Sequence, residues 1–143
     1  MNNSEEIIAA SEELGIVGYV MPEVEGVNYI RFVLDRYKPH KTSGHLSIYY
    51  NSVSLPLEEH EFTYSKHLDN EPVSIFFDQE GTEANKVVVI EQGKRLGEIF
   101  ENSYGMEYFV SNKKADYLLA VNWYVIEGAG TAVDWINTLR NNK

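Results

Sequence analysis

Hydrophobic residues follow two different periods along this chain, and the order in which the periods change restricts the fold. Helical spacing marks Ile30, Val33, Leu34 and Tyr37, which recur at i, i+3, i+4 and i+7. From Gly44 onward the pattern changes to the two-residue alternation and the β-branched runs that are typical of strands. Helices grouped at the start and followed by consecutive strands indicate an α+β fold, because a doubly wound parallel sheet requires strands and helices to alternate.

The first two helices are predicted from their start and stop signals. Ser4 followed by two glutamates begins the first helix, and Gly15 is placed to end it. Pro22 suits the first turn of a second helix over residues 23–37, and Lys38-Pro39 ends that helix because the residue before proline avoids helical geometry.

The rest of the chain predicts a mainly antiparallel sheet of about five or six strands, with one inserted helix and a C-terminal helix. The helix between strands is expected around residues 96–100, and Thr131 begins the last helix, with Asp134 completing a T-x-x-D capping box. Gly128-Ala-Gly130 is expected to break the chain before it. Candidate strands lie at residues 44–50, 62–64, 73–78, 86–91, 106–111, 117–121 and 125–127.

Size and composition favour one folded domain over residues 1–143. The 143 residues are enough to bury a core. Cysteine is absent from the sequence, which excludes disulfides and thiolate chemistry and fits a reducing compartment. The N-terminal residues have no basic and apolar segments of the signal-peptide type, and no apolar run approaches the ~18 residues of a membrane span. We therefore expect a cytoplasmic protein without membrane contact.

The net charge of −10 is unevenly distributed along the chain. Residues 1–30 contain six acidic residues and no basic one, and residues 58–83 contain eight acidic residues against Lys66 alone. An acidic chain is a poor binder of nucleic acid, since phosphate contacts need a basic face. A cationic protein partner is the natural complement, although acidity also serves solubility alone.

No sequence motif identifies a reaction. His60, with its neighbouring glutamates, and His67 offer nitrogen and oxygen ligands, but the H-E-x-x-H spacing of metalloproteases is missing. A G-x-S-x-G nucleophile elbow is also missing from the sequence. We therefore predict a protein that is not an enzyme and that has no catalytic residues, no metal site and no cofactor.

The segment 73–130 resembles a group of small bacterial proteins of unassigned function. The resemblance is carried by Phe76-Phe-Asp-Gln79, by Tyr104-Gly-Met-Glu-Tyr-Phe-Val-Ser-Asn-Lys113 and by Tyr117-Leu-Leu-Ala-Val-Asn122. The group has an Asn-His-His or similar turn where this chain has Asn122-Trp123-Tyr124, so a role for those histidines does not transfer. In size, acidity and lack of cysteine and catalytic motifs, the chain is similar to immunity proteins of bacterial polymorphic toxins, including those of contact-dependent growth inhibition.

These features lead to the hypothesis of an immunity protein that binds a cognate toxin, a basic nuclease domain, and covers its active site. The acidic segment 58–83 is predicted to supply the contacts. The predicted partner-binding residues are Glu58, Glu59, Glu61, Asp69, Glu71, Asp78, Glu80 and Glu83. Two alternatives remain open: a small metal- or histidine-dependent enzyme that uses His60 or His67 on a polar substrate, and a regulatory subunit of a housekeeping complex.

Overall fold

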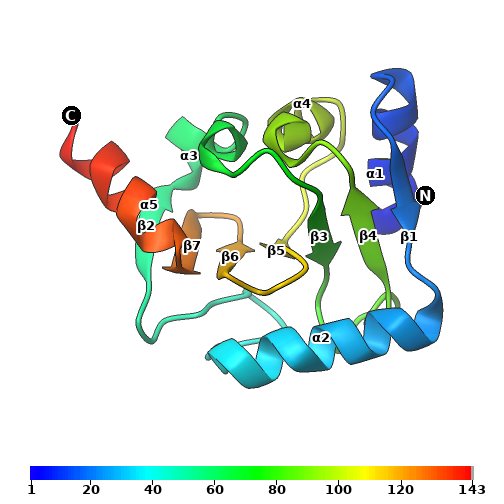
Figure 1. The fold of residues 1–143 in the computed structure, drawn as a ribbon, viewed down its shortest axis with the longest axis horizontal. Coiled ribbons are helices and arrows are strands. Elements are labelled where there is room, and N and C mark those ends of the chain that lie inside the picture. The colour runs from blue at the N-terminus through cyan, green and yellow to red at the C-terminus, as the bar shows by residue number, and fades with distance from the viewer. Residues whose placement is uncertain (143) are drawn as a thin grey trace.

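A computed structural model describes residues 1–142 and shows an α+β fold with one antiparallel sheet of seven strands, as the sequence predicts in class (Figure 1). The order across the sheet is β1-β4-β3-β5-β6-β7-β2. The strands are β1 (Gly18–Val20), β2 (Val53–Pro56), β3 (Val73–Phe76), β4 (Val87–Ile90), β5 (Tyr108–Ser111), β6 (Tyr117–Val121) and β7 (Val125–Gly130). The α-helices are α1 (Asn3–Glu13), α2 (Glu23–Tyr37), α3 (Leu57–His60), α4 (Leu96–Glu101) and α5 (Ala132–Asn141), and two 3-10 turns, η1 (Tyr64–His67) and η2 (Gly93–Arg95), precede α4.

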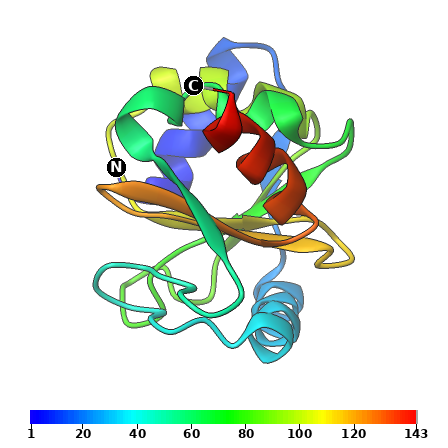
Figure 2. The same cartoon turned by 90° about the vertical axis from the view of Figure 1, so that its left-hand side faces the viewer.

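The sheet separates two hydrophobic cores. Figure 2 shows α2 and the loop 38–52 on one side of the sheet and the other helices on the opposite side. Successive strand residues point to opposite faces, so Ile75 packs with α1, α4 and α5 whereas Phe76 packs with α2. Both faces of the central strands are covered, so every residue of β3, β4, β5 and β6 is buried.

The second helix has the bounds that its sequence signals predict. Ile30 and Val33 are buried against the sheet, and Lys38 adopts the left-handed conformation (φ 44°) that ends the helix before Pro39. Packing explains the glycine at position 26 within the helix, because a Cβ there would lie 2.9 Å from the backbone oxygen of Asn85. The absence of a side chain lets the helix approach the loop before β4.

The predicted strand at residues 44–50 is wrong, and its alternation is right only for the burial of Leu46 and Ile48, since Tyr50 is 58% exposed. Leu46 and Ile48 are buried in the α2 core, but the segment is a loop with a single isolated bridge between Lys41 and Ser47. The backbone amides of Leu46, Ile48 and Tyr49 donate to the carboxylates of Glu107 and Glu127 and not to a neighbouring strand. The alternation therefore predicts the burial of Leu46 and Ile48 but not the conformation of the backbone.

The predictions differ from the structure in four further respects. Residues 62–64, a candidate strand, lie in the helical segment around α3 and η1. The chain does not break at Gly128, since β7 continues through Gly130. The absence of a side chain at Gly128 leaves room for the side chain of Ile136 in α5. The short edge strands β1 and β2 are additions to the predicted sheet. Thr131 begins α5 as predicted, but the structure shows no side-chain capping bond there among the described residues.

No helix within the described part of the chain is both long and apolar enough to cross a membrane.

Candidate functional site

The eight acidic residues of the segment 58–83 fall into three groups in the structure. The first group lies on or directly after α3, the second precedes β3 and the third follows β3. The groups are Glu58, Glu59 and Glu61; Asp69 and Glu71; and Asp78, Glu80 and Glu83. β3 has four residues, so about 13 Å of strand separates the second group from the third. The structure therefore does not bring the eight carboxylates together on one continuous patch.

The third group contains two carboxylates that hold the fold. Glu83 is only 6% exposed and accepts hydrogen bonds from the backbone amides of Asn3 (2.9 Å) and Ser4 (3.0 Å). A carboxylate at this position satisfies free amides at the start of α1 and faces the positive end of the helix dipole. Asp78 accepts from the amide of Gly44 at 2.9 Å and thereby ties the loop 38–52 to the end of β3.

The second group borders a cavity of about 700 Å³ on the α2 face of the sheet. The side-chain amide of Asn112 donates to Glu71 at 3.0 Å and to Asp116 at 2.9 Å, and the hydroxyl of Tyr29 donates to the backbone oxygen of Asn112 at 2.7 Å. Burial raises the pKa of the Tyr29 phenol to about 12, so the phenol is protonated and donates at neutral pH. The cavity wall is thus a fixed polar network, and Asp69 lies exposed at its edge.

The first group stands beside an exposed aromatic turn. The backbone amide of Leu57, the first residue of α3, donates to the backbone oxygen of Tyr124 at 3.0 Å. Glu58 and Glu59 follow directly and are exposed, whereas Glu61 is half-buried and burial raises its pKa. The acidic start of α3 and the turn between β6 and β7 therefore form neighbouring parts of one surface.

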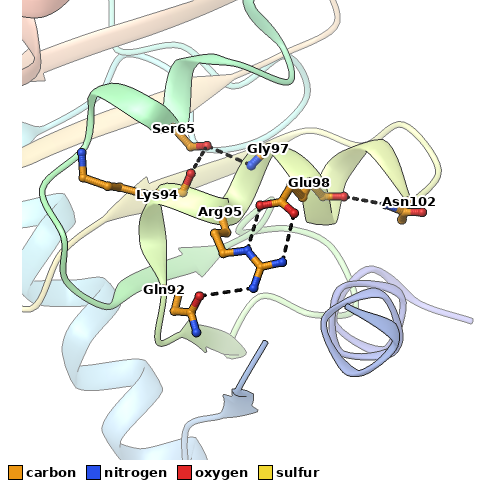
Figure 3. A network of polar contacts seen from close by, with 7 residues as sticks. All are labelled: Ser65, Gln92, Lys94, Arg95, Gly97, Glu98 and Asn102. Atoms are coloured by element: carbon orange, nitrogen blue, oxygen red, sulfur yellow. Dashed lines mark hydrogen bonds and ion pairs between the residues drawn. The ribbon is translucent and has the colours of Figure 1, made fainter. Parts of the chain in front are cut away.

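A polar network fixes the segment that follows α3 (Figure 3). The hydroxyl of Ser65 donates to the backbone oxygen of Lys94 (3.0 Å) and accepts from the amide of Gly97 (2.9 Å). Arg95 donates through two nitrogens to Glu98 at 2.8 and 3.0 Å. Gly97 permits close packing, because a Cβ there would lie 2.1 Å from the backbone oxygen of Phe62. These contacts join the α3–η1 segment to α4 and set the position of the acidic group.

The turn between β6 and β7 presents Trp123 and Tyr124 on a backbone that Asn122 holds. The side-chain oxygen of Asn122 accepts from the amides of Tyr124 (2.8 Å) and Val125 (3.0 Å), and its nitrogen donates to the backbone oxygen of Leu46 at 3.1 Å. The turn is predicted from the sequence, and the structure confirms it. Because one amide group satisfies three backbone atoms, the turn is joined to the loop 38–52.

The loop 38–52 adds two further exposed rings, Tyr49 and Tyr50. The carboxylate of Glu127 accepts from the amides of Ile48 (3.0 Å) and Tyr49 (3.3 Å), and Tyr49 adopts a left-handed backbone (φ 64°). A non-glycine residue in that region is uncommon and costs free energy, so its neighbours must hold it there. The rings of Tyr49 and Tyr50 meet edge to face with centroids 5.0 Å apart.

Together these rings form what we call the aromatic surface: Tyr49, Tyr50, Trp123 and Tyr124. Each side chain is between 50% and 71% exposed, and the ring of His45, with its centroid 5.7 Å from that of Tyr124, links the loop to the turn. Some other tyrosines are internal, such as Tyr64, whose buried hydroxyl pairs with that of Tyr108 at 2.8 Å. Large rings on a fixed backbone lose little conformational entropy when a partner covers them.

The two histidines of the enzymatic alternative have structural neighbours. His67 stacks on Trp135 with centroids 5.4 Å apart, and burial lowers the pKa of its imidazole. His60 Nε2 lies 3.7 Å from a carboxylate oxygen of Glu59. Over residues 1–142, no group of three or more histidine, aspartate or glutamate side chains has the arrangement of a metal site.

Comparison of the chain with protein-family models, curated proteins and solved structures gave no match.

Sequence reasoning missed the carboxylates that hold the backbone of the loop 38–52 in place beside the aromatic surface. Glu107 and Glu127 lie beside apolar strand residues, and their carboxylates accept backbone amides of the loop 38–52. A charged residue within an otherwise apolar strand segment is a signal for such a role, because a buried or half-buried carboxylate needs donors. Asn122 gives a weaker signal, since asparagine is also an ordinary turn residue.

Proposed function

We propose that this chain is a cytoplasmic immunity protein that binds a cognate toxin and neutralises it by covering its active site. The observation that supports this best is the arrangement of Trp123 and Tyr124 directly beside the acidic start of α3, on a backbone fixed by Asn122 and by the Leu57–Tyr124 hydrogen bond. Tyrosine and tryptophan dominate the energetics of protein interfaces, whereas a small-molecule enzyme needs a concave site with convergent catalytic groups.

The two parts of the surface have different roles in the proposed interface. The carboxylates of Glu58 and Glu59 attract a basic partner over a distance and take the place of phosphate groups in a nuclease site. The rings of Trp123 and Tyr124 then exclude water and slow dissociation, with a hot-spot residue contributing about 2 kcal/mol or more. A basic nuclease domain is therefore the partner class that fits this surface.

A co-expression assay tests the function. Cells that express a basic nuclease toxin domain, the proposed partner, are scored for survival with the wild-type chain, with Glu58→Lys/Glu59→Lys, and with Trp123→Ala/Tyr124→Ala. We expect the wild-type chain to protect and both double variants to lose protection while they retain wild-type circular dichroism and unfolding midpoints.

The matched control is Glu12→Lys/Glu13→Lys, which makes the same charge change on two exposed residues of α1. We expect the control to protect as the wild-type chain does. Equal loss of protection in the control and in Glu58→Lys/Glu59→Lys would show that only the total charge matters. Full protection by both surface variants would exclude the aromatic surface and the α3 group as the contact site.

A further inference from the structure

The strand β1 ends the sheet on the side opposite β2, and two of its residues turn their backbone groups away from the sheet. The amide of Met21 donates to the oxygen of Val87, and the amide of Glu91 donates to the oxygen of Val17. In an antiparallel pair, alternate residues face the neighbouring strand, so Val17, Tyr19 and Met21 face β4. Gly18 and Val20 therefore direct their N–H and C=O groups outward, where another strand can pair with them.

The two edges of the sheet differ in how they are protected against pairing. At the end of β2, the backbone amide of Leu57 donates to the backbone oxygen of Tyr124. Because alternate residues of an antiparallel strand face its neighbour, the backbone groups of Ser54 and Pro56 point away from β7. Proline has no N–H to offer, and its presence at an outward position blocks the addition of a further strand. The β1 edge, Gly-Tyr-Val, contains no proline and no charged residue. The fold thus blocks one edge and leaves the other able to pair.

The surroundings of the β1 edge favour an extended partner segment. Val17, Tyr19 and Val20 are exposed apolar side chains on or beside this strand. Tyr19 and Met21 also form a wall of the 700 Å³ cavity, whose other walls include both acidic residues, such as Glu25 and Glu71, and the basic residues Lys113 and Lys114. A strand that paired with β1 would place alternate side chains over Tyr19, within reach of this cavity.

Charge selects the occupant of this edge. Residues 1–30, which contain β1, carry six acidic residues and no basic one, and each copy of the chain has a net charge of −10. Two copies that paired through β1 would bring these like charges together, which opposes self-association. A lysine or arginine side chain from a different protein would instead meet a cavity in which four carboxylates, those of Glu25, Asp69, Glu71 and Asp116, outnumber the two ammonium groups of Lys113 and Lys114.

We infer that the β1 edge binds an extended, basic segment of a partner protein by strand addition, with its cationic side chains directed into the cavity beneath Tyr19. Backbone hydrogen bonds to Gly18 and Val20 provide the pairing, and the carboxylates provide selectivity for basic side chains. This edge lies across the sheet from the aromatic surface, so the inference is independent of the proposed function and goes beyond it.

The experiment titrates the full chain with a synthetic peptide of alternating valine and lysine, followed by amide NMR and hydrogen exchange. We expect saturable binding, with slowed exchange at the amides of Gly18 and Val20. Val20→Pro removes an outward N–H without removing a bond to β4, and we expect it to weaken binding by about fivefold or more. Ser54→Pro is the matched control at an outward position of the opposite edge, and we expect it to leave the affinity unchanged.

A second variant tests the electrostatic part without altering the strand. Glu25→Lys at the cavity wall should lower the affinity for the valine–lysine peptide and flatten its salt dependence, whereas a valine–glutamate peptide should not bind the wild-type chain. The inference is overturned if the valine–lysine peptide fails to bind, or if Val20→Pro and Ser54→Pro bind it equally. Sedimentation that shows a dimer of the chain, dissociated by Val20→Pro, would also overturn it in favour of a second copy as the occupant.

Discussion

Replacement of Glu83 by glutamine tests the distinction between carboxylates that hold the fold and carboxylates that meet a partner. Glu83 belongs to the acidic segment 58–83, but its two oxygens accept the amides of Asn3 and Ser4 at 2.9 and 3.0 Å. Glutamine has nearly the same shape and keeps one acceptor oxygen. Its NH2 group then faces the second amide, so one buried N–H of the first turn of α1 loses its partner.

The expected loss of stability follows from these two bonds. One charge-assisted bond becomes a neutral one, which costs about 1 kcal/mol, and an unsatisfied buried amide costs about 1–3 kcal/mol. Loss of the negative charge at the helix start adds about 0.3–1 kcal/mol. We therefore expect the free energy of unfolding to fall by about 2–5 kcal/mol, a large part of the 5–15 kcal/mol that is typical of a domain.

Urea unfolding followed by far-ultraviolet circular dichroism measures this change. The control is Glu80→Gln, which removes an exposed charge from the same turn and is expected to change stability by less than about 0.5 kcal/mol. If the Glu83→Gln and Glu80→Gln variants unfold at the same urea concentration, Glu83 does not hold α1 and the assignment of structural and functional carboxylates is refuted.

Three further predictions concern packing, protonation and the aromatic surface. Gly97→Ala would place a Cβ 2.1 Å from the backbone oxygen of Phe62, so it should destabilise the chain by about 2 kcal/mol or more and lower its melting temperature. The control is Gly81→Ala, whose Cβ would come no closer than 3.4 Å to the nearest atom outside its chain neighbours, and this variant should leave the melting temperature unchanged. Burial lowers the pKa of His67 below 6.5, so as the pH falls the unfolded state takes up a proton at this residue before the folded state does. The urea midpoint of unfolding should therefore decrease as the pH falls below about 6.5. A His67→Gln variant whose midpoint has the same pH dependence would contradict this. Glu127→Gln weakens two amide bonds of the loop 38–52, so hydrogen exchange at residues 48–49 should accelerate about tenfold; unchanged exchange would show that the loop is held by other contacts.

The sequence predicted those elements whose determinants are local. The second helix has the predicted bounds because its apolar stripe, Pro22 and Lys38-Pro39 all act within a few residues. The central strands were predictable from apolar runs that both cores bury. β1 and β2 were missed because each is short and lies at an edge, where pairing with β4 or β7 decides the conformation and intrinsic propensity does not.

The candidate site was predictable only in part, because its contacts are distant in sequence. Counting charges located the acidic segment 58–83, but burial of Glu83 depends on amides 79 and 80 residues away. Burial of Leu46 and Ile48 followed from their alternation, whereas the bonds from Glu107 and Glu127 that replace a neighbouring strand could not be predicted from local patterns. Likewise, nothing in the sequence places Tyr124 beside the start of α3.

The kinetics of binding to the basic nuclease domain that we propose as the partner, measured by stopped-flow fluorescence at several salt concentrations, test the central claim most directly. Carboxylates that steer association should make the association rate fall as salt rises, since the screening length is about 10 Å at 0.1 M. Glu58→Lys/Glu59→Lys should lower the association rate and flatten its salt dependence, whereas Trp123→Ala/Tyr124→Ala should mainly raise the dissociation rate. Unchanged rates in both variants would contradict a toxin-binding role for this surface.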